Sequence, residues 1–498
     1  MTPHLFKLPD ASGLSLRDRI CEVVSAAITS RALPHDRPLP SCRELASQLD
    51  VSRNTVFAAY HRLIELGFLI ARDRSGYFVN PDLRMSLSPP DGEDGTARRG
   101  DVPPAPIEFE PSTLIPIENP LDWVRYPYPF IYNQFDPNLF PVDAWRECSR
   151  QALSRRQMPV WVGDSVESDS PRLVQQLRQR VLSYRGIYAD DEEILVTLGA
   201  QNALCIVSMV LANRNRPIAI EDPGFHGARN AFRVAGHELV GVPVDRDGLI
   251  PSAIPAGSQL VFTTPSHQFP TMVTMPLSRR RTLIEAAIER DFLILEDDYE
   301  AEINYFTRPS PSLRSLDASG RVVYVGSLSK TISPGIRLGF IVAHRNIIRE
   351  ARTIRGVMLR HPPTIVQETA ARFIRLGYYD AHLRNVERRY RKRWHTMRDA
   401  IRRHLGMLDT TDTIGGSCFW LTGPAGFDAT ELAARLKSRG VLVDKGQTFF
   451  LNNDNRRSFR VGFAYVPVGK LEEGVRIIAE EVRKLLSPPP ATGSGEGG

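Results

Sequence analysis

The spacing of apolar residues separates an N-terminal segment of short helices from a much longer part in which strands and helices alternate. Between residues 16 and 30, Ile20, Val23, Val24 and Ala27 recur at helical spacing. Such a stripe predicts an amphipathic helix that packs one side against a small core.

Two more helices and a hairpin are predicted directly after it. Ser41 and Glu44 form a capping box that starts a short helix, and Ser52 caps the next helix, which ends near Gly67. The stretch FLIARDRSGYFV then predicts two short strands, so residues 1–80 indicate a winged helix-turn-helix. The predicted apolar face of the helix after Ser52 comprises Val56, Ala59, Leu63 and Leu66.

The rest of the chain has a different pattern. Residues 81–120 are rich in Pro, Gly and charge and have no period, which predicts a linker, and residues 487–498 predict a disordered tail. Across residues 121–486, apolar runs alternate with long helical stretches, which predicts an α/β domain with a largely parallel sheet. The runs are EILVTLG, RPIAIED, QLVFTTP, FLILEDD and RVVYVGS.

Composition narrows the class of protein only slightly. The chain has 498 residues, of which 42% are hydrophobic and 24% charged, and a net charge of +6, as expected for a globular protein of two or three domains. Its five cysteines lie far apart, so we expect no disulfide framework, no metal site and a reducing, cytoplasmic location. The N-terminus has no signal-peptide pattern, and polar residues interrupt the uncharged run 194–212, which predicts a buried strand and helix rather than a membrane span.

The helix that Ser52 caps begins with residues suited to DNA. In a helix-turn-helix this end meets bases and phosphates, for which hydroxyl, guanidinium and amide groups are suitable partners. Charge does not decide the matter, because residues 1–80 hold ten basic and eight acidic residues, and a solvated helical hairpin would look similar. The candidate DNA-binding residues are Arg43, Ser52, Arg53, Asn54, Thr55 and Gly76.

The stretch LPSCRELASQLDVSRNTVFAAYHRLIELGFLIARDRSGYFV resembles the winged helix of GntR-type bacterial transcription regulators along its whole length. The resemblance implies that residues 1–80 bind operator DNA and that the candidate residues above occupy positions that contact it. Phe57 departs from relatives that place a base-reading arginine there, so the base preference stays open.

In the α/β part, the stretch GSLSKTISPGIRLGF places Lys330 among hydroxyl residues. An amine that binds the aldehyde of pyridoxal phosphate needs further groups for the rest of that cofactor. For its phosphate, Ser327 and Ser329 offer hydroxyls and Arg337 offers a guanidinium, while the turn at residues 199–201 offers free backbone N–H groups.

The ring of the cofactor makes its own demands. Its pyridinium nitrogen needs a carboxylate, which Asp297 supplies at the end of a predicted buried strand, and Phe225 offers an aromatic cover. Tyr299, His267 and Gln268 are alternatives for its phenolic oxygen. Each residue alone has a simpler explanation as a capping, core or ion-pair residue, but their order at strand ends favours a cofactor site. The cofactor-binding candidates are Lys330, Asp297, Tyr299, Phe225, Ser327, Ser329, Arg337, Ala200, Gln201 and His267.

Residues 121–486 resemble fold-type I, aspartate-aminotransferase-like enzymes, whose cofactor positions Asp297, Lys330 and Arg337 match. In such enzymes a late arginine holds the substrate carboxylate, and Arg460 in SFRVGFA is its match. Met272 in FPTM departs from the usual glycine, which puts the shape of the substrate side in doubt.

Together the two halves resemble the MocR/GabR subfamily of transcription regulators. DWVRYPYPFIYNQFDPNLF, LVTLGAQNAL and LRHPP resemble its branch of taurine and ectoine catabolism regulators. The resemblance implies a homodimer, often domain-swapped, with pyridoxal 5'-phosphate on Lys330 as an internal aldimine. An effector such as taurine or an ectoine-derived amino acid would displace Lys330, form an external aldimine and place its acidic group on Arg460. The expected partners are operator DNA, the effector and a second copy of the chain, and no membrane.

Three other functions stay open at this point. The chain could be a working aminotransferase that carries a DNA-binding domain, since Asp297 and Lys330 would support that chemistry. It could sense pyridoxal phosphate itself and control vitamin B6 synthesis, or it could be a structural DNA-binding protein with an inactive second domain. The sequence names neither the effector nor the operator, and it does not distinguish an activator from a repressor.

Overall fold

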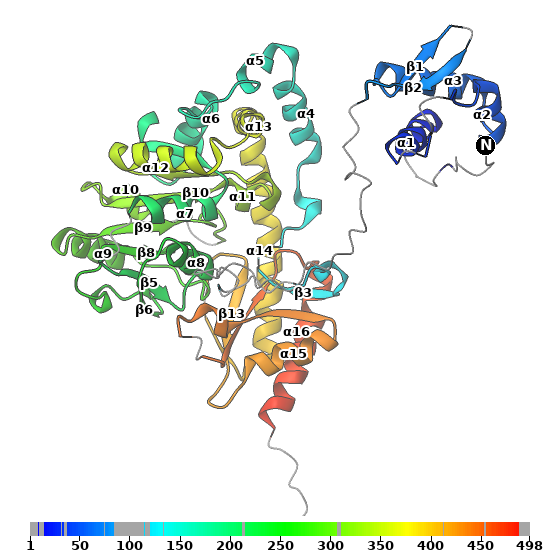
Figure 1. Ribbon diagram of the computed structural model, residues 1–498. Coiled ribbons are helices and arrows are strands. Elements are labelled where there is room, and N and C mark those ends of the chain that lie inside the picture. The colour runs from blue at the N-terminus through cyan, green and yellow to red at the C-terminus, as the bar shows by residue number, and fades with distance from the viewer. Residues whose placement is uncertain are drawn as a thin grey trace, which may run out of the picture. The chain divides into compact units, whose positions relative to one another are not determined.

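The computed structural model describes residues 8, 14–30, 32–33, 37–73, 75–83, 114, 120–132, 134–211, 215–305, 310–411, 413–452 and 455–487. The chain divides into two compact units, Met1–Pro106 and Ile107–Gly498 (Figure 1). Most of the predicted linker 81–120 and of the predicted tail 487–498 lies outside the described residues.

The first unit is a winged helix-turn-helix, as predicted. Its elements are α1 (Leu16–Thr29), α2 (Cys42–Leu49), α3 (Arg53–Glu65), β1 (Leu69–Arg72) and β2 (Gly76–Val79), and the two strands pair antiparallel. Both predicted caps are present: the Ser41 hydroxyl accepts from the backbone N–H of Glu44 at 3.2 Å, and that of Ser52 accepts from Thr55 at 3.1 Å. Leu66 was wrongly assigned to the apolar face, because α3 has ended and the residue is 50% exposed.

The second unit is built on an eight-stranded sheet that contains all five predicted strands. The strand order is β4-β11-β10-β9-β8-β5-β6-β7. The sheet is largely parallel, but β11 runs antiparallel to both of its neighbours and β7 antiparallel to β6. The strands are β4 (Ile194–Thr197), β5 (Ile218–Asp222), β6 (Leu239–Asp245), β7 (Gly248–Leu249), β8 (Leu260–Thr263), β9 (Leu293–Asp297), β10 (Val322–Ser327) and β11 (Gly339–Val342).

Both faces of this sheet are covered by helices, which explains why its strands are apolar throughout. On β10, Val323 and Val325 face one core, while Val322 and Tyr324 face the cores of the opposite side. The run 194–212 forms β4 and α7, as predicted, and none of the described helices is both long and apolar enough to cross a membrane. The helices up to this point of the chain are α4 (Val142–Ala152), α5 (Met158–Trp161), α6 (Pro171–Gln176), α7 (Ala200–Val210), α8 (His226–Val234), α9 (Leu277–Glu289), α10 (Leu313–Leu316) and α11 (Leu328–Thr331).

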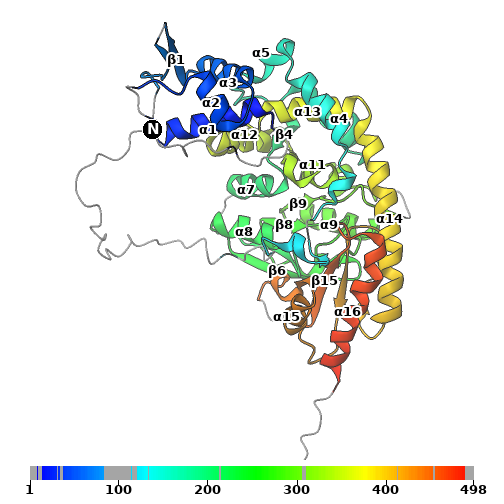
Figure 2. The ribbon, with the colours of Figure 1, turned by 90° about the vertical axis from the view of Figure 1, so that its right-hand side faces the viewer.

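A second, five-stranded sheet, which the sequence pattern did not predict, completes this unit. Its order is β12-β13-β15-β14-β3, and β3 joins it from far along the chain. The long helix α14 runs from α13 to α16 in both views, so it spans the two halves of the unit (Figures 1 and 2). The remaining elements are β3 (Tyr128–Phe130), α12 (Arg345–Leu359), α13 (Thr364–Arg375), α14 (Tyr378–His404), β12 (Asp409–Thr410), β13 (Cys418–Thr422), α15 (Ala429–Ser438), β14 (Val441–Lys445), β15 (Ser458–Gly462) and α16 (Val468–Leu486).

A buried ion pair ties the start of this unit to its large sheet. Asp169 accepts from the guanidinium groups of Arg352, at 3.0 Å, and of the fully buried Arg355. Its third contact is the backbone N–H of Val196 on β4, at 3.2 Å. The carboxylate therefore fixes α12 and β4 to the segment that precedes α6.

We expect Asp169→Ala to lower the free energy of unfolding of this unit by about 3–5 kcal/mol, because the Arg355 guanidinium would stay buried without its counter-ion. Chemical denaturation followed by tryptophan fluorescence measures the loss. Asp143→Ala is the control, since Asp143 forms an exposed ion pair with Arg146. Equal stability of both variants would contradict the role given to Asp169.

Candidate functional site

The carboxyl ends of the parallel strands meet at one edge of the large sheet, where they surround a cavity of about 240 Å³. Most of the predicted cofactor residues lie around it, although they come from the ends of four strands and the start of a fifth, β11. Tyr132, His226, Phe269 and Pro334 also line it and were not predicted. The predicted residues that line the cavity are Ala200, Gln201, Phe225, Asp297, Tyr299, Ser327, Ser329, Lys330 and Arg337.

Lys330 lies on the short helix α11, directly after β10. Its Nζ is 3.7 Å from the centre of the Tyr132 ring and 5.7 Å from that of Tyr299. Burial lowers the pKa of Lys330 to about 8, against the opposing effect of nearby carboxylates. The amine is therefore available as a nucleophile at a pH where an ordinary lysine is fully protonated.

Asp297 is the last residue of β9 and pairs in register with Val325 of the neighbouring β10. It is buried, and its Oδ1 has no hydrogen-bond partner among the described residues. Burial, together with Asp298, raises the pKa of Asp297 to about 7, while Lys330 acts in the opposite direction. An unpartnered carboxylate oxygen beside the cavity suits a cationic ring N–H such as that of pyridoxal phosphate.

The opposite end of the cavity is suited to a phosphate group. Gly199, with φ 79°, leads into α7, whose first N–H groups at Ala200 and Gln201 have no partner inside the helix. A Cβ atom on Gly199 would lie 3.2 Å from Nη2 of Arg337, so a side chain here would crowd that guanidinium, and the positive φ also favours glycine. Arg337 itself has φ 52° and donates to the carbonyl of Leu198 at 2.9 Å.

The two predicted serines, Ser327 and Ser329, differ in the hydrogen bonds that their hydroxyls form. The hydroxyl of Ser329 donates to the carbonyl of Leu338 at 3.2 Å and accepts from its N–H at 3.1 Å. It therefore fixes the turn between α11 and β11 as well as lining the cavity. Ser327 lines the cavity at the end of β10.

An aromatic cluster forms part of the cavity wall. Phe225, directly before α8, packs edge-on against Phe269 at 5.1 Å, and Tyr132 contacts Phe269 at 5.0 Å. His226 also faces Phe269. Burial and the neighbouring arginines lower the pKa of His226 to about 4, so the imidazole is neutral near pH 7.

His267 and Gln268 lie outside the cavity lining. His267 is buried beside Gly415, where a Cβ would come within 2.6 Å of its ring. The Gln268 amide donates to backbone carbonyls of Pro223 and Phe269 and to the buried Glu221 carboxylate, which holds the loop in place. In this loop it is Phe269, two residues after His267, that lines the cavity.

Met272 has a left-handed backbone with φ 64°. This is the position at which the sequence departs from the glycine of the enzymes it resembles. A non-glycine residue there costs about 1–2 kcal/mol. Its Sδ lies 4.0 Å from the Tyr299 hydroxyl, and a Cβ atom on Gly416 would come within 2.7 Å of that sulfur. The side chain thus fills space next to Tyr299.

Arg460 lies on β15, fully buried, between the rings of Phe269, at 4.3 Å, and Tyr132, at 4.5 Å. Its Nε and Nη2 donate to Asp444 of β14 at 3.1 and 2.8 Å, an ion pair that was not predicted. Its Nη1 is buried and has no partner among the described residues. One side of the guanidinium is therefore neutralised, and the other can still donate to an acid.

In the winged helix, the predicted DNA-binding residues lie on the surface. Arg43, Arg53, Asn54 and Gly76 are exposed, and Gly76 has φ 102°, which favours glycine at the tip of the wing. Two of these residues also have a local role: the hydroxyls of Ser52 and Thr55 lie 2.8 Å apart at the start of α3. Phe57 is 49% exposed and packs against His61.

Comparisons with known proteins match both units. Residues 16–79 match the model for bacterial regulatory proteins of the gntR family, and residues 150–478 match that for aminotransferase class I and II. Over 484 residues the chain is 41% identical to the HTH-type transcriptional regulator TauR of Rhodobacter capsulatus, which covers 96% of this chain and 98% of that protein. It is 30% identical over 397 residues to the probable rhizopine catabolism regulatory protein MocR of Rhizobium meliloti, covering 79% of this chain and 78% of that one. The solved α-aminoadipate aminotransferase LysN of Thermus thermophilus, complexed with N-(5'-phosphopyridoxyl)-L-leucine, superposes with a TM-score of 0.67 at 27% identity, over 73% of this chain and 94% of its own.

The pKa of Lys330 can be tested on the cofactor-free protein. Acylation at a series of pH values, quantified peptide by peptide with mass spectrometry, should show Lys330 titrating with a pKa of about 8. Its labelling should therefore level off above that pH, because the neutral amine reacts and the ammonium does not. The exposed Lys392 is the internal control for the labelling chemistry. Identical profiles for both lysines would show that burial does not tune Lys330.

Proposed function

Because the chain belongs to the MocR-type regulators, in which a GntR-family winged helix is joined to a domain of aminotransferase class I and II, we propose that it controls transcription in response to a small amine that binds through pyridoxal phosphate at Lys330. The observation that carries the proposal is the pair of Asp297 and Lys330. A buried carboxylate with a free oxygen and a lysine of lowered pKa line the same cavity.

The residues around the cavity have distinct tasks in this proposal. Pyridoxal phosphate, when bound, supplies an aldehyde carbon that combines reversibly with amines. Asp297 would hold the proton of the ring nitrogen, Phe225 would cover the ring, and the start of α7 with Arg337 would bind the phosphate. Lys330 would hold the cofactor covalently, in competition with a ligand amine.

Arg460 selects the ligand by its acidic end. Nη1 is free to donate, and the surrounding rings of Tyr132 and Phe269 exclude water, which strengthens a charge-assisted bond. The fitting ligands are small amines with a carboxylate or sulfonate, such as taurine or an ectoine-derived amino acid. The chain thus acts as a sensor in which ligand binding favours one arrangement of the winged helices, and two copies would read a repeated operator.

A working aminotransferase is the second candidate function, and the same two residues favour it. Asp297 would keep the ring nitrogen protonated, so that the cationic ring can accept an electron pair, and the neutral form of Lys330 would act as a base. Release of a carbonyl product from an amino acid in repeated cycles with a keto-acid acceptor separates an enzyme from a sensor. DNA binding that responds to the cofactor alone would instead favour control of vitamin B6 synthesis.

Titration of the cofactor-loaded protein tests the sensing function. Addition of pyridoxal phosphate should give a yellow absorbance that Lys330→Ala abolishes, and Asp297→Asn should weaken cofactor binding by about tenfold to a hundredfold, since a hydrogen bond to a charged group is lost. A panel of amines should then change the spectrum of the wild type only when the amine carries an acid. Arg460→Lys should keep the colour but lose about tenfold in response to acidic amines, because a lysine cannot serve Asp444 and a ligand together. A wild-type protein that stays colourless would refute the proposal.

Operator binding tests the winged helix separately. Arg53→Ala should weaken binding to the operator by roughly tenfold or more, about 1–3 kcal/mol, because its guanidinium is exposed at the start of α3. Fluorescence anisotropy at a fixed salt concentration measures the affinity. Arg62→Ala, later on the same helix and paired with Glu65, is the matched control. If both variants bind as the wild type does, α3 does not contact the DNA through its N-terminal end.

A further inference from the structure

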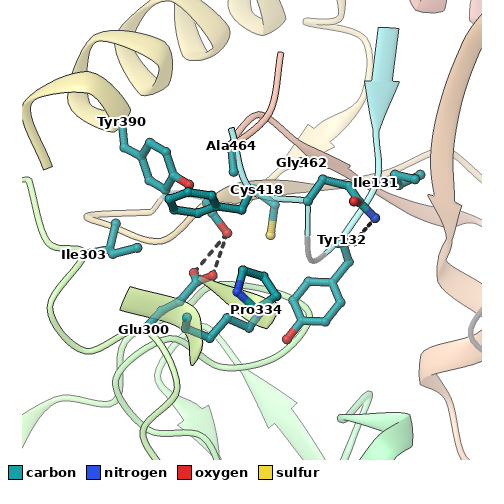
Figure 3. Close-up of a pocket in the computed structure, with 13 residues that line it drawn as sticks. Ile131, Tyr132, Glu300, Ile303, Pro334, Tyr390, Cys418, Gly462 and Ala464 are labelled. Atoms are coloured by element: carbon teal, nitrogen blue, oxygen red, sulfur yellow. Dashed lines mark hydrogen bonds between the residues drawn. The ribbon is translucent and has the colours of Figure 1, made fainter. Parts of the chain in front are cut away.

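Lys330 lies between two cavities, of which only the larger suits a cofactor. The second, of about 30 Å³, shares Tyr132, Lys330 and Pro334 with the first, and Figure 3 shows Tyr132 and Pro334 in its wall. Its volume corresponds to one water molecule or one ammonium group. Its polar residues include Glu300 and Ser417, and its other walls come from residues such as Tyr390, Cys418 and Ala464.

Glu300 supplies the negative charge of this second cavity. It is 5% exposed, and the hydroxyl of Ser417 lies 2.8 and 3.0 Å from its two oxygens, so a single proton serves both. Among the described residues, no arginine, lysine or histidine lies within 4.0 Å of this carboxylate. A buried carboxylate with one hydroxyl donor is costly unless a cation compensates it.

Lys330 is the cation that interacts electrostatically with Glu300. Of the groups that surround this lysine, Glu300 raises its pKa most, and Cys418 and Asp297 act in the same direction. Arg460 and burial act against them. Glu300 is thus the main counter-charge of Lys330, although the two do not form an ion pair in the structure.

We propose that Glu300 and Ser417 form an ammonium site for Lys330: when a ligand amine takes its place on the cofactor, the displaced side chain moves into the small cavity and pairs with Glu300. The proposal rests on the proposed function, since it concerns what Lys330 does after ligand binding. The site is adjacent to the lysine, has room for one ammonium group and offers one carboxylate.

The exchange balances in atoms and charge. One carbon–nitrogen bond to the cofactor forms as another breaks, and the proton that the incoming ammonium gives up ends on Nζ of Lys330. Once protonated and paired with Glu300, Lys330 cannot remove a proton from the bound ligand. The site therefore favours a lasting complex over transfer of the amino group, which is the difference between a sensor and an enzyme.

The first test uses the cofactor-free protein and the labelling assay for Lys330. Glu300→Gln keeps the size and the hydrogen bond to Ser417 but removes the charge, so the pKa of Lys330 should fall by about one unit, a tenfold change in the ratio of amine to ammonium. Glu300→Asp keeps the charge and should restore most of the difference. A melting curve for each variant shows that it is folded.

Glu302→Gln is the matched control. Glu302 belongs to the same loop, and burial raises its pKa to about 7, but it faces Tyr379 rather than Lys330. Its loss should leave the labelling of Lys330 unchanged. An unshifted pKa of Lys330 in Glu300→Gln, or an equal shift in Glu302→Gln, would overturn the ammonium site.

The second test uses the loaded protein with an acidic amine that it recognises. Transfer of the amino group would oxidise the ligand by two electrons to a carbonyl compound, with its oxygen from water, and leave the cofactor in its amine form. The rate of this conversion at pH 7, followed by absorbance and by mass spectrometry of the released carbonyl compound, should rise about fivefold in Glu300→Gln, in proportion to the larger fraction of neutral Lys330 when its pKa falls from about 8 by one unit. It should stay at the wild-type rate in Glu302→Gln.

The two proposals can fail separately. A wild-type protein that never colours with pyridoxal phosphate refutes the sensing function, and the ammonium site with it. A wild-type protein that colours and responds to amines, together with a Glu300→Gln variant that labels and converts as the wild type does, refutes the ammonium site alone.

Discussion

The mutual compensation of a few buried charges is the constraint on which the second unit depends. Lys330, Asp297, Glu300, Arg460 and Asp444 lie in a region with little water, where an isolated charge would be strongly disfavoured. The protonation of these groups therefore depends on the charges of their neighbours. Burial pushes the lysine toward its neutral form and the two aspartates toward theirs, and the opposite charges nearby counteract both trends. The aromatic rings around Arg460 belong to the same arrangement, because they keep out the water that would otherwise screen these interactions.

Local signals in the sequence were sufficient for much of the fold. The caps at Ser41 and Ser52 and the five apolar runs are short-range features, and each corresponds to an element of the structure. The candidate cofactor residues could be grouped before any contact was known, since parallel strands end at a common edge and polar residues there must lie close together. Strand pairing could not be read in this way. The antiparallel course of β11 and the joining of β3 to β14 depend on contacts between segments far apart in the chain.

The residues that sequence reasoning missed share one property: their role depends on a partner in another element. The contacts of Tyr132, Asp444 and Glu300 form only when the small sheet and the loop after β9 come together beside Lys330, so the sequence alone does not reveal them. His267 and Gln268 were predicted from the same loop that contains Phe269. The backbone of this loop turns His267 inward and Phe269 toward the cavity, which the sequence pattern does not reveal. The error at Leu66 has a simpler cause, because helical spacing continues one residue beyond the point where α3 ends.

The candidate site residues come from two sheets, which has a consequence for how this protein family can diversify. Asp297 ends β9 and Lys330 follows β10 in the eight-stranded sheet, whereas Arg460 and Asp444 lie on strands of the five-stranded sheet. Under the proposed function, a substitution on β14 or β15 would alter which acid is recognised without disturbing the groups that would hold the cofactor. New ligand preferences would then arise on one layer of the molecule while the chemistry of the other is inherited intact.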